Sequence, residues 1–522
     1  MTNDRLQAAA ITRRNAIALM SGAAVTASLG APALAQATPK RGGTLRVSAF
    51  TNPSSLDPAT GGAGSDHTFL YTMYDTLTDW DFETLKPKPG LAESWTFSDP
   101  TTLVLNIRQG IAFHDGTKLD AEAVKFNLDR AKTDAKSNIK ADVATVASVE
   151  VTGPMQVTLK LNTPDTALPA ILSDRAGMMV SPTALKAAGG NGLNRAPVGT
   201  GAYTFVSWAD GDRIITRRNE KYWKPNRPYM DGIEFAIIPE LTTGSRSVSA
   251  GQNDLIYQLP PRQKVIMERS ANLKIVTGPT LYVFQIFFNW GKPPFDDLKV
   301  RKAFNFGVDR EALVKASLAG LAEPGYMNLP KAHWAYDKTT AALYPYDVNK
   351  AKQLLGEAGW KEGTVVELGG YPDQDSVQRQ EILIEQLRKV GMTLKFNTAP
   401  VAEASATFFG NEKKNSGLLA AWTGRPDPSQ TYSLMFTKDA YFNAGRSPVP
   451  PELDAALKES RATEDIEKRR EAFENVQRIV MENAFVCPLA FQFELVAMNK
   501  RVQGYKPNLL GKPKYDDVWL ES

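Results

Sequence analysis

An α/β fold built from two or more lobes is what this sequence predicts, and two observations carry the prediction. The chain has 522 residues, more than one hydrophobic core accommodates, so we expect it to divide into lobes. After residue 37, strand-like runs alternate with amphipathic helices, a pattern typical of lobes with parallel or mixed sheets. Hydrophobic residues make up 43% of the chain and charged residues 23%, which are ordinary values for a globular protein.

Residues 1–37 read as an export signal. The pair Arg13-Arg14 precedes an uncharged stretch whose apolar part, 16–29, is too short to span a bilayer. Small residues follow, and "APALAQA" offers cleavage after Ala35 or after Ala37. The paired arginines favour the twin-arginine route, and no cysteine stands near the cleavage site to carry a lipid. We therefore expect a soluble periplasmic protein that is not a lipoprotein.

The first half of the remaining chain reads largely as short strands. Residues 118–132 form an amphipathic helix in this half, and Asp120 is placed to be its N-cap. Hairpins are expected to turn at Gly153-Pro154 and at 210–212, where turn-forming residues interrupt the strand patterns. The strand-like runs lie at 42–50, 94–97, 101–107, 111–113, 146–162, 197–219 and 233–240.

The second half is richer in helices. A long helical stretch at 297–318 is interrupted at Val308-Asp309, and a helix at 347–360 is closed by Gly359 as a C-cap. Strands are expected at 281–289 and 364–371, and further helices at 376–390, 450–463 and 465–484.

Composition and motifs argue against several classes of function. Lys and Arg total 61 against 57 Asp and Glu, without a basic tract, so we expect no nucleic-acid partner. The single Cys487 lies in an apolar run and is expected to be buried, and three scattered histidines predict no metal site. No Gly-x-Ser-x-Gly elbow accompanies a His-Asp pair, and "GTG" at 199–201 reads as a tight turn. We expect neither catalytic residues nor a cofactor.

The stretch "AAWTGRPDPSQTYSLMF", residues 420–436, combines a turn with side chains typical of small-molecule sites. Trp422 offers an aromatic wall, and the guanidinium of Arg425 suits a carboxylate or phosphate. Two interpretations of Arg425 stand side by side. Either it faces a ligand, or it points to solvent or pairs with Asp427 within the turn.

Four blocks of the chain resemble solute-binding protein family 5, which comprises dipeptide-, oligopeptide- and nickel-binding components of ABC importers. They occur in the order that the family has and cover most of the chain after residue 37. The blocks are "GLAESWTFSDPTTLVLNIRQGIAFHDGTKLDAEAVKFNLDRA", "APVGTGAYTFVSWADGDRIITRRNEKYW", "FNWGKPPFDDLKVRKAFNFGVDREALV" and "YDVNKAKQLLGEAGW".

The resemblance implies a bilobed periplasmic-binding-protein fold, type II-like, with an extra inserted subdomain. On the family's pattern, lobe I comprises 38–72, 196–280 and 499–522, the inserted subdomain 73–195, and lobe II 281–498. It also implies a monomer that closes around one solute and then docks on an inner-membrane ABC permease.

The same resemblance indicates the ligand-binding residues. In peptide-binding members, the segment that matches 421–428 has a Trp followed by an Asp that holds the ammonium group of the peptide. Here Arg425 stands after Trp-Thr-Gly and Asp427 is displaced, so we expect this corner to favour an anionic or carbonyl group. The site residues that we predict are Trp422, Arg425, Asp427, Tyr371 and Asn289.

The function predicted from the sequence is that of an extracytoplasmic receptor of an ABC importer. Its expected ligand is a short peptide or a peptide-like, opine-like or other carboxylate-bearing small molecule. Two alternatives remain open at this point: a secreted α/β hydrolase acting on peptides or esters, and a chaperone-like binder of unfolded chains.

Overall fold

The computed structural model describes residues 38–522, apart from 190–191, 411, 439, 444–446 and 522. The chain separates into two units, Met1–Pro39 and Lys40–Ser522, and everything below concerns the second. The predicted export signal, 1–37, lies outside the described residues. Among the residues that are described, no helix is both long enough and apolar enough to cross a membrane.

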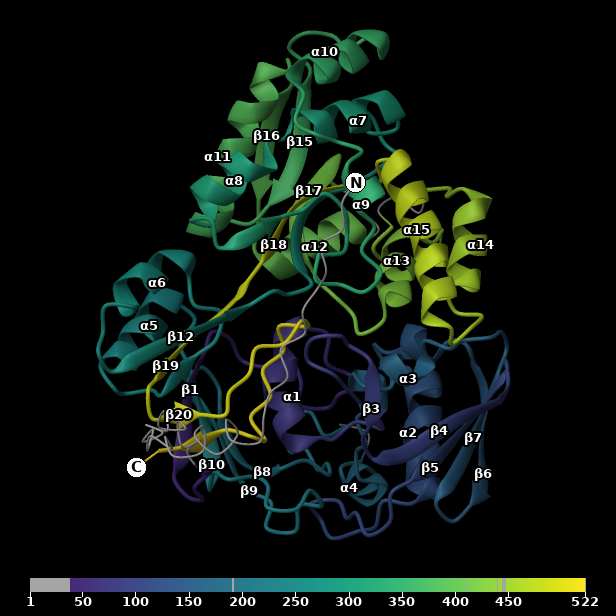
Figure 1. Ribbon diagram of the computed structural model, residues 1–522, viewed down its shortest axis with the longest axis vertical. Helices are drawn as coiled ribbons and strands as arrows, with labels where there is room; N and C mark the ends of the chain where they lie inside the picture. The colour runs from purple at the N-terminus through teal and green to yellow at the C-terminus, as the bar shows by residue number, and fades with distance from the viewer. Residues whose placement is uncertain (1–37, 190–191, 411, 439, 444–446, 522) are drawn as a thin grey trace, which may run out of the picture. The chain divides into compact units, whose positions relative to one another are not determined.

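A mixed seven-stranded sheet gathers segments from the two ends and the middle of the chain. Its strand order is β12-β19-β11-β1-β10-β9-β8 (Figure 1). β1 is parallel to β10 and β11, while the remaining pairs are antiparallel. The strands are β1 (Thr44–Ala49), β8 (Tyr203–Ala209), β9 (Arg213–Arg218), β10 (Gly232–Ile237), β11 (Leu255–Ile256), β12 (Leu273–Gly278) and β19 (Glu494–Asn499).

Helices lie on both faces of this sheet. α5 (Leu241–Ser249) and α6 (Pro261–Met267) pack on one side, over β1, β11, β12 and β19. α1 (His67–Met73) is buried along its whole length, and its Phe69 ring meets Phe235 of β10 edge-on at 4.9 Å. The short β20 (Val502–Gln503) and β21 (Trp519–Leu520) pair near the end of the chain.

A four-stranded antiparallel sheet with order β4-β5-β7-β6 lies within residues 92–161. The helix α2 (Ala121–Thr133) packs on it, and Asp120 accepts a hydrogen bond from the backbone N–H of Ala123 at 2.9 Å, which confirms the predicted N-cap. The other elements between residues 64 and 187 are η1 (Gly64–Asp66), β2 (Thr78–Trp80), β3 (Pro87–Pro89), β4 (Ala92–Asp99), β5 (Thr102–Ile107), η2 (Lys140–Val143), β6 (Val146–Gly153), β7 (Gln156–Leu161), α3 (Leu168–Ile171), η3 (Arg175–Gly177) and α4 (Pro182–Ala187).

The strand expected at 111–113 is wrong. The backbone N–H of Phe113 donates to Thr117 and that of Gly116 donates to Phe113, each at 2.8 Å. These residues therefore close a tight loop on themselves, and a single bridge, Ala112 to Lys118, is what remains of extended pairing.

A six-stranded mixed sheet, β14-β18-β13-β17-β15-β16, organises the second half. The predicted interruption at Val308-Asp309 is confirmed, because α7 ends at Gly307 and α8 begins at Arg310. The strands are β13 (Tyr282–Phe288), β14 (Ala322–Pro324), β15 (Val365–Gly370), β16 (Thr393–Thr398), β17 (Gly417–Thr423) and β18 (Val486–Gln492). The helices are α7 (Leu298–Gly307), α8 (Arg310–Ser317), α9 (Lys338–Ala341), α10 (Val348–Glu357), α11 (Gln374–Lys389), α12 (Val401–Phe409), α13 (Pro428–Phe436), α14 (Pro451–Glu459) and α15 (Ile466–Glu482).

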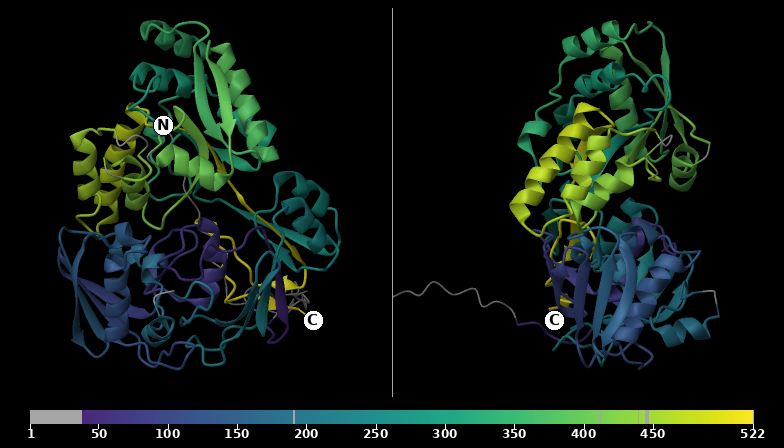
Figure 2. Two further views of the ribbon diagram at one scale, coloured as in Figure 1. Left: turned by 180° about the vertical axis from the view of Figure 1, so that it is seen from behind. Right: turned by 90° about the vertical axis from the view of Figure 1, so that its right-hand side faces the viewer.

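Two segments of the chain connect the two large sheets. β12 continues into β13, and β18 continues into β19. The β18–β19 connection is the yellow ribbon that runs from one sheet to the other in the left view of Figure 2. The hydroxyl of Thr280 on the first connection donates to the carbonyl of Gln492 on the second at 2.5 Å. β19 begins at Glu494. The lobe boundaries that the resemblance implies, residue 499 among them, stay predictions.

Candidate functional site

Trp422 forms a fixed wall near the end of β17. Its side chain is 4% exposed and its indole N–H donates to the hydroxyl of Thr431 at 3.2 Å. The ring of Phe442 meets it edge-on at 5.1 Å. Because the indole is held on two sides, it is a rigid surface for whatever packs on its free face.

Asp427 is committed within the chain. Its carboxylate caps α13, accepting from the N–H of Ser429 at 2.9 Å and from the hydroxyl of Ser429 at 2.6 Å. The other oxygen accepts from Nη2 of Arg469 at 2.6 Å. Although burial opposes ionisation, Arg469 and Ser429 hold the pKa of Asp427 below its ordinary value. A direct contact between Asp427 and the ligand stays a prediction, and these partners count against it.

Arg425 is half-buried and lies against the tryptophan, with its guanidinium carbon 5.0 Å from the centre of the Trp422 ring. Its Nη1 donates weakly to the carbonyl of Gly424 at 3.2 Å and to the carbonyl and hydroxyl of Thr423 at 3.4 Å. Within the described ranges no carboxylate forms an ion pair with Arg425, and the cation that pairs with Asp427 is Arg469. The guanidinium is thus held in place without an ion pair in these ranges, and the carboxylate that its charge influences is Asp142.

Asp142 of η2 lies opposite this corner. Its Oδ1 accepts from Nε2 of Gln430, in α13, at 2.9 Å. Burial raises the pKa of Asp142, and the nearby positive charge of Arg425 counteracts that rise. The other amide atom of Gln430, Oε1, is buried without a hydrogen-bond partner among the described residues. An unused buried acceptor is costly, so this oxygen is placed to receive a donor from a bound molecule.

Lys512 is a second buried cation close to Arg425. Its ammonium donates to Asp174 at 2.6 Å, and Nε2 of His67 approaches the other oxygen of Asp174 at 2.5 Å. Burial lowers the pKa of Lys512 to about 8; Asp174 opposes this shift, and repulsion from Arg425 adds to it. We call Asp142, Arg425, Gln430, Lys512 and Asp174 the charged cluster. It offers positive charge for an anion and, at Gln430 and Asp142, acceptors for a donor.

Tyr371 lies on the same sheet edge as Arg425, and Asn289 does not. β15 and β17 are parallel, and Tyr371 and Arg425 follow their C-terminal ends, the edge at which open α/β sheets bind ligands. β13 runs antiparallel to β17, with Phe288 opposite Gly417, so Asn289 follows at the other edge. There its side-chain oxygen accepts from the N–H of Gly291 at 3.2 Å. Neither residue's contact with a ligand is tested by these positions, and both stay predictions.

The sequence prediction missed four members of the charged cluster. Gln430 lies inside the stretch 420–436, where its spacing from Arg425 was an available signal. Asp142, Asp174 and Lys512 carried no such signal, because Asp142 stands 288 positions before Gln430 and Lys512 stands 338 positions after Asp174. Such contacts depend on how the chain folds rather than on local pattern.

The histidines and the cysteine have structural roles. The Nε2–H of His114 donates to the carbonyl of Gly201 at 2.9 Å and so fastens the 199–201 turn that the sequence predicts. Cys487 is fully buried, as expected, and burial raises the pKa of its thiol to about 11. In the part of the chain that the structure describes, no three His, Cys, Asp or Glu side chains gather in a metal-binding arrangement.

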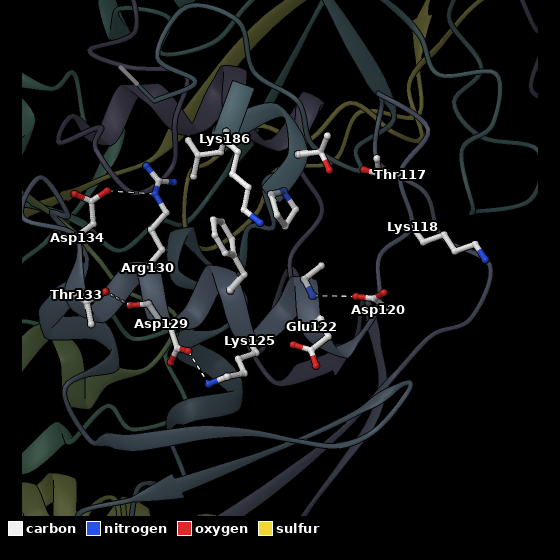
Figure 3. Close-up of a pocket in the computed structure, with 15 residues that line it drawn as sticks. Thr117, Lys118, Asp120, Glu122, Lys125, Asp129, Arg130, Thr133, Asp134 and Lys186 are labelled. Atoms are coloured by element: carbon white, nitrogen blue, oxygen red, sulfur yellow. Dashed lines mark hydrogen bonds and ion pairs between the residues drawn. The ribbon is translucent and has the colours of Figure 1, made fainter. Parts of the chain in front are cut away.

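A hollow of about 690 Å³ lies between α2 and α4, away from the predicted site residues (Figure 3). Two ion pairs stand along it: Lys125 with Asp129 at 2.7 Å, and Arg130 with Asp134 at 3.3 Å. Arg130 also binds both oxygens of Asp57 at 3.0 and 2.7 Å. Four of the eight charged side chains that line the hollow are thus engaged in these two ion pairs.

Comparison with known proteins gives a consistent result. Residues 86–443 match the family described as "Bacterial extracellular solute-binding proteins, family 5 Middle". The glutathione-binding protein GsiB of Escherichia coli (strain K12) is 28% identical over 475 residues, covering 88% of this chain and 91% of that protein.

Two solved structures share the fold. The ABC transporter-associated periplasmic binding protein DppA from Helicobacter pylori, in complex with the peptide STSA, has a TM-score of 0.84 at 23% identity and covers 92% of this chain and 99% of its own. The binding protein AgaA from A. tumefaciens R10, in complex with agropinic acid, has a TM-score of 0.81 at 22% identity, with the same coverage of 92% and 99%. The likeness confirms the predicted α/β periplasmic-binding-protein fold.

Proposed function

Because this chain belongs to family 5 of the bacterial extracellular solute-binding proteins, we propose that it captures a small solute with a carboxylate or similar anionic group and delivers it to an ABC permease. The anionic group is bound by Arg425. The ligand class is a short peptide or a peptide-like or opine-like molecule, bound by a periplasmic monomer that reaches its compartment by the twin-arginine route.

The observation that carries this proposal is the environment of Arg425. A guanidinium held at 5.0 Å over the Trp422 ring, with only weak neutral acceptors at 3.2 to 3.4 Å, gains most from an ionised partner. No nearby carboxylate forms an ion pair with Arg425: Asp427 pairs with Arg469 and Asp174 with Lys512. Asp142, whose charge Arg425 stabilises, accepts a hydrogen bond from the neutral amide of Gln430. A ligand carboxylate supplies the ion pair that Arg425 lacks within the described ranges.

The acceptors beside Arg425 favour a ligand that also carries a donor. The unpartnered Oε1 of Gln430 and the carboxylate of Asp142 face the same corner from α13 and η2. An ammonium or amide N–H of the ligand satisfies both. GsiB binds glutathione, DppA was solved with a peptide and AgaA with agropinic acid, so molecules with carboxylates and N–H donors support the proposed class.

Binding among these residues couples capture to closure. Arg425 and Gln430 follow β17 of the six-stranded sheet, whereas Asp142 belongs to η2 and Lys512 to the C-terminal segment that follows β20. A ligand that contacts both sets binds best when they are close together, so it stabilises the closed arrangement. Repulsion between Lys512 and Arg425 opposes that arrangement until an anion lies between them.

Native mass spectrometry of the purified protein, followed by a thermal-shift panel, tests the proposal. The panel holds glutathione, the peptide STSA, agropinic acid and a nickel–histidine chelate. A bound solute raises the melting temperature by mass action. For the ligand that binds best, we expect Arg425→Ala to weaken affinity roughly 10- to 100-fold, because a charged hydrogen bond contributes about 1.5–3 kcal/mol.

Arg388→Ala is the matched control, since Arg388 is an exposed arginine of α11 that pairs with Glu385 at 2.9 Å. It should leave affinity unchanged. The carboxamide of the same ligand should lose binding to the wild-type protein and show no further loss with Arg425→Ala. Equal affinities of wild type and Arg425→Ala would refute a role for Arg425 in anion binding.

A further inference from the structure

A second cavity, of about 340 Å³, lies where the β2–β3 hairpin, the segment after β9 and the end of the chain meet. Its lining is almost entirely charged: Asp79, Lys88, Lys224, Arg227, Lys506, Lys514, Asp516 and Asp517, with Phe82 as the one aromatic side chain. It shares no residue with the charged cluster. Lys512 of that cluster bonds to Asp174, whereas Lys514 bonds to Asp79.

Each carboxylate that lines this cavity has a lining cation as its partner. Asp79 accepts from Lys514 at 2.6 Å, Asp516 from Lys224 at 3.3 Å, and Asp517 from Nε of Arg227 at 2.5 Å. The charges of these six side chains therefore cancel in pairs. What remains in the lining is the positive charge of Lys88 and Lys506.

Neither of these two lysines is strongly neutralised. Lys88 has one carboxylate neighbour, Asp81, at 4.0 Å, and both side chains are nearly half exposed, so this pair contributes little. Lys506 is exposed and forms no ion pair with any residue that the structure describes. The two ammonium groups come from separate elements, β3 and the segment after β20, and border the same cavity.

Two of the paired groups are held strongly in their charged forms. Although burial opposes ionisation, Lys514 and Lys224 hold the pKa of Asp79 at about 2. Burial opposes the charge of Lys224 too, but Asp516, Asp75 and Asp79 outweigh it and raise the pKa of that lysine. Asp79 and Lys224 are therefore charged at neutral pH, and the three ion pairs of the lining do not involve Lys88 or Lys506.

We propose that this cavity is a second binding site, separate from the solute site, for a small dianion such as a phosphate ester or a dicarboxylate. Ammonium groups bind phosphate and carboxylate as point charges, and two of them match a doubly charged ligand. The volume is within the range of small-molecule sites. Phe82, over which Lys88 lies at 5.7 Å, provides one apolar wall for the carbon part of such a ligand.

Titration calorimetry with the full chain tests the site, with inorganic phosphate and succinate as separate probes and sodium chloride at equal ionic strength as the reference. We expect one of the two dianions to bind at a single site, and the stronger probe identifies the class. The double variant Lys88→Gln/Lys506→Gln should weaken that binding at least tenfold. Both lysines are solvent-accessible, so the fold should be retained, which an unchanged melting temperature verifies.

The double variant Lys221→Gln/Lys500→Gln is matched to it in charge, because both lysines are exposed and lie outside the cavity lining. It should bind as wild type does, and so should Arg425→Ala, which separates this site from the solute site. Asp516→Asn removes a lining negative charge and should tighten binding. The proposal is overturned by absence of binding of both probes, by an equal heat with chloride, or by equal weakening in the two double variants.

Discussion

At the scale of single residues, the contacts of Asp427 and Arg425 differ from what their charges suggest. Asp427 looks like an anchor for a ligand ammonium, yet it is 2% exposed and pairs with Arg469 of α15, so it fixes the turn in which Arg425 stands. Arg425 looks like a turn residue, yet it lies on Trp422 without an ion-pair partner among the described residues. Of the two, Arg425 is therefore the charge that has no ion pair in the described part of the chain, and the carboxylate of Asp427 supports the turn in which Arg425 stands.

The buried Asp427–Arg469 pair predicts that replacing its carboxylate by an amide lowers the free energy of unfolding strongly. Asp427→Asn retains an N-cap, because Asn caps helices as well as Asp, but it leaves the Arg469 charge buried and unpaired. We expect the free energy of unfolding to fall by about 3 kcal/mol, the usual effect of breaking a buried pair. Urea denaturation followed by tryptophan fluorescence measures it. Asp465→Asn, at the exposed cap of α15, should change it by less than about 0.5 kcal/mol, and equal effects would contradict this role.

At the scale of elements, the sequence predicted a helix cap and a helix break that depend on neighbouring residues. Asp120 caps α2 three residues away, and Val308-Asp309 separates α7 from α8. The strand expected at 111–113 is wrong because the chain reverses at once: Phe113 bonds to Thr117, and only the Ala112–Lys118 bridge forms. The candidate site shows the same difference between local signals and long-range contacts. Trp422 and Arg425 were found from one short stretch, whereas Asp142 and Lys512 reach it only through long-range packing.

The cap of α2 gives a prediction at this scale. Asp120→Ala removes the acceptor of the Ala123 N–H, which is 2.9 Å from it, and should cost about 1 kcal/mol. Hydrogen exchange measured by mass spectrometry should then accelerate in the first turn of α2. Asp129→Ala, on the exposed face of the same helix, removes an i,i+4 pair with Lys125 and should have a smaller effect. Unchanged exchange in Asp120→Ala would show that packing alone holds this turn.

At the scale of the whole molecule, the connection between the two large sheets contains a buried carboxylate. Glu494 begins β19 directly after the chain leaves β18, and it is 7% exposed. Tyr505 donates to one of its oxygens, and the backbone N–H of Asn508 donates to the other at 3.0 Å. Burial raises its pKa from 4.5 to about 7, against the effect of these two donors. The side-chain amide of Asn508 also donates to the backbone carbonyl of Lys512 at 2.8 Å, so hydrogen bonds through Asn508 link Glu494 to the segment that holds Lys512.

The raised pKa of Glu494 makes stability depend on pH in a defined direction. Below about pH 4.5 the folded and unfolded states both carry the proton, so Glu494 does not lower the free energy of unfolding. As pH rises from about 4.5 to about 7 the unfolded chain releases the proton first, so stability falls, by about 3 kcal/mol in total. Above about pH 7 Glu494 is ionised in both states, so its ionisation lowers the free energy of unfolding no further. Urea midpoints at pH 5 and pH 8 measure it, and Glu494→Gln, which stays neutral, should flatten that difference. An equal difference in wild type and variant would assign the pH dependence to other groups.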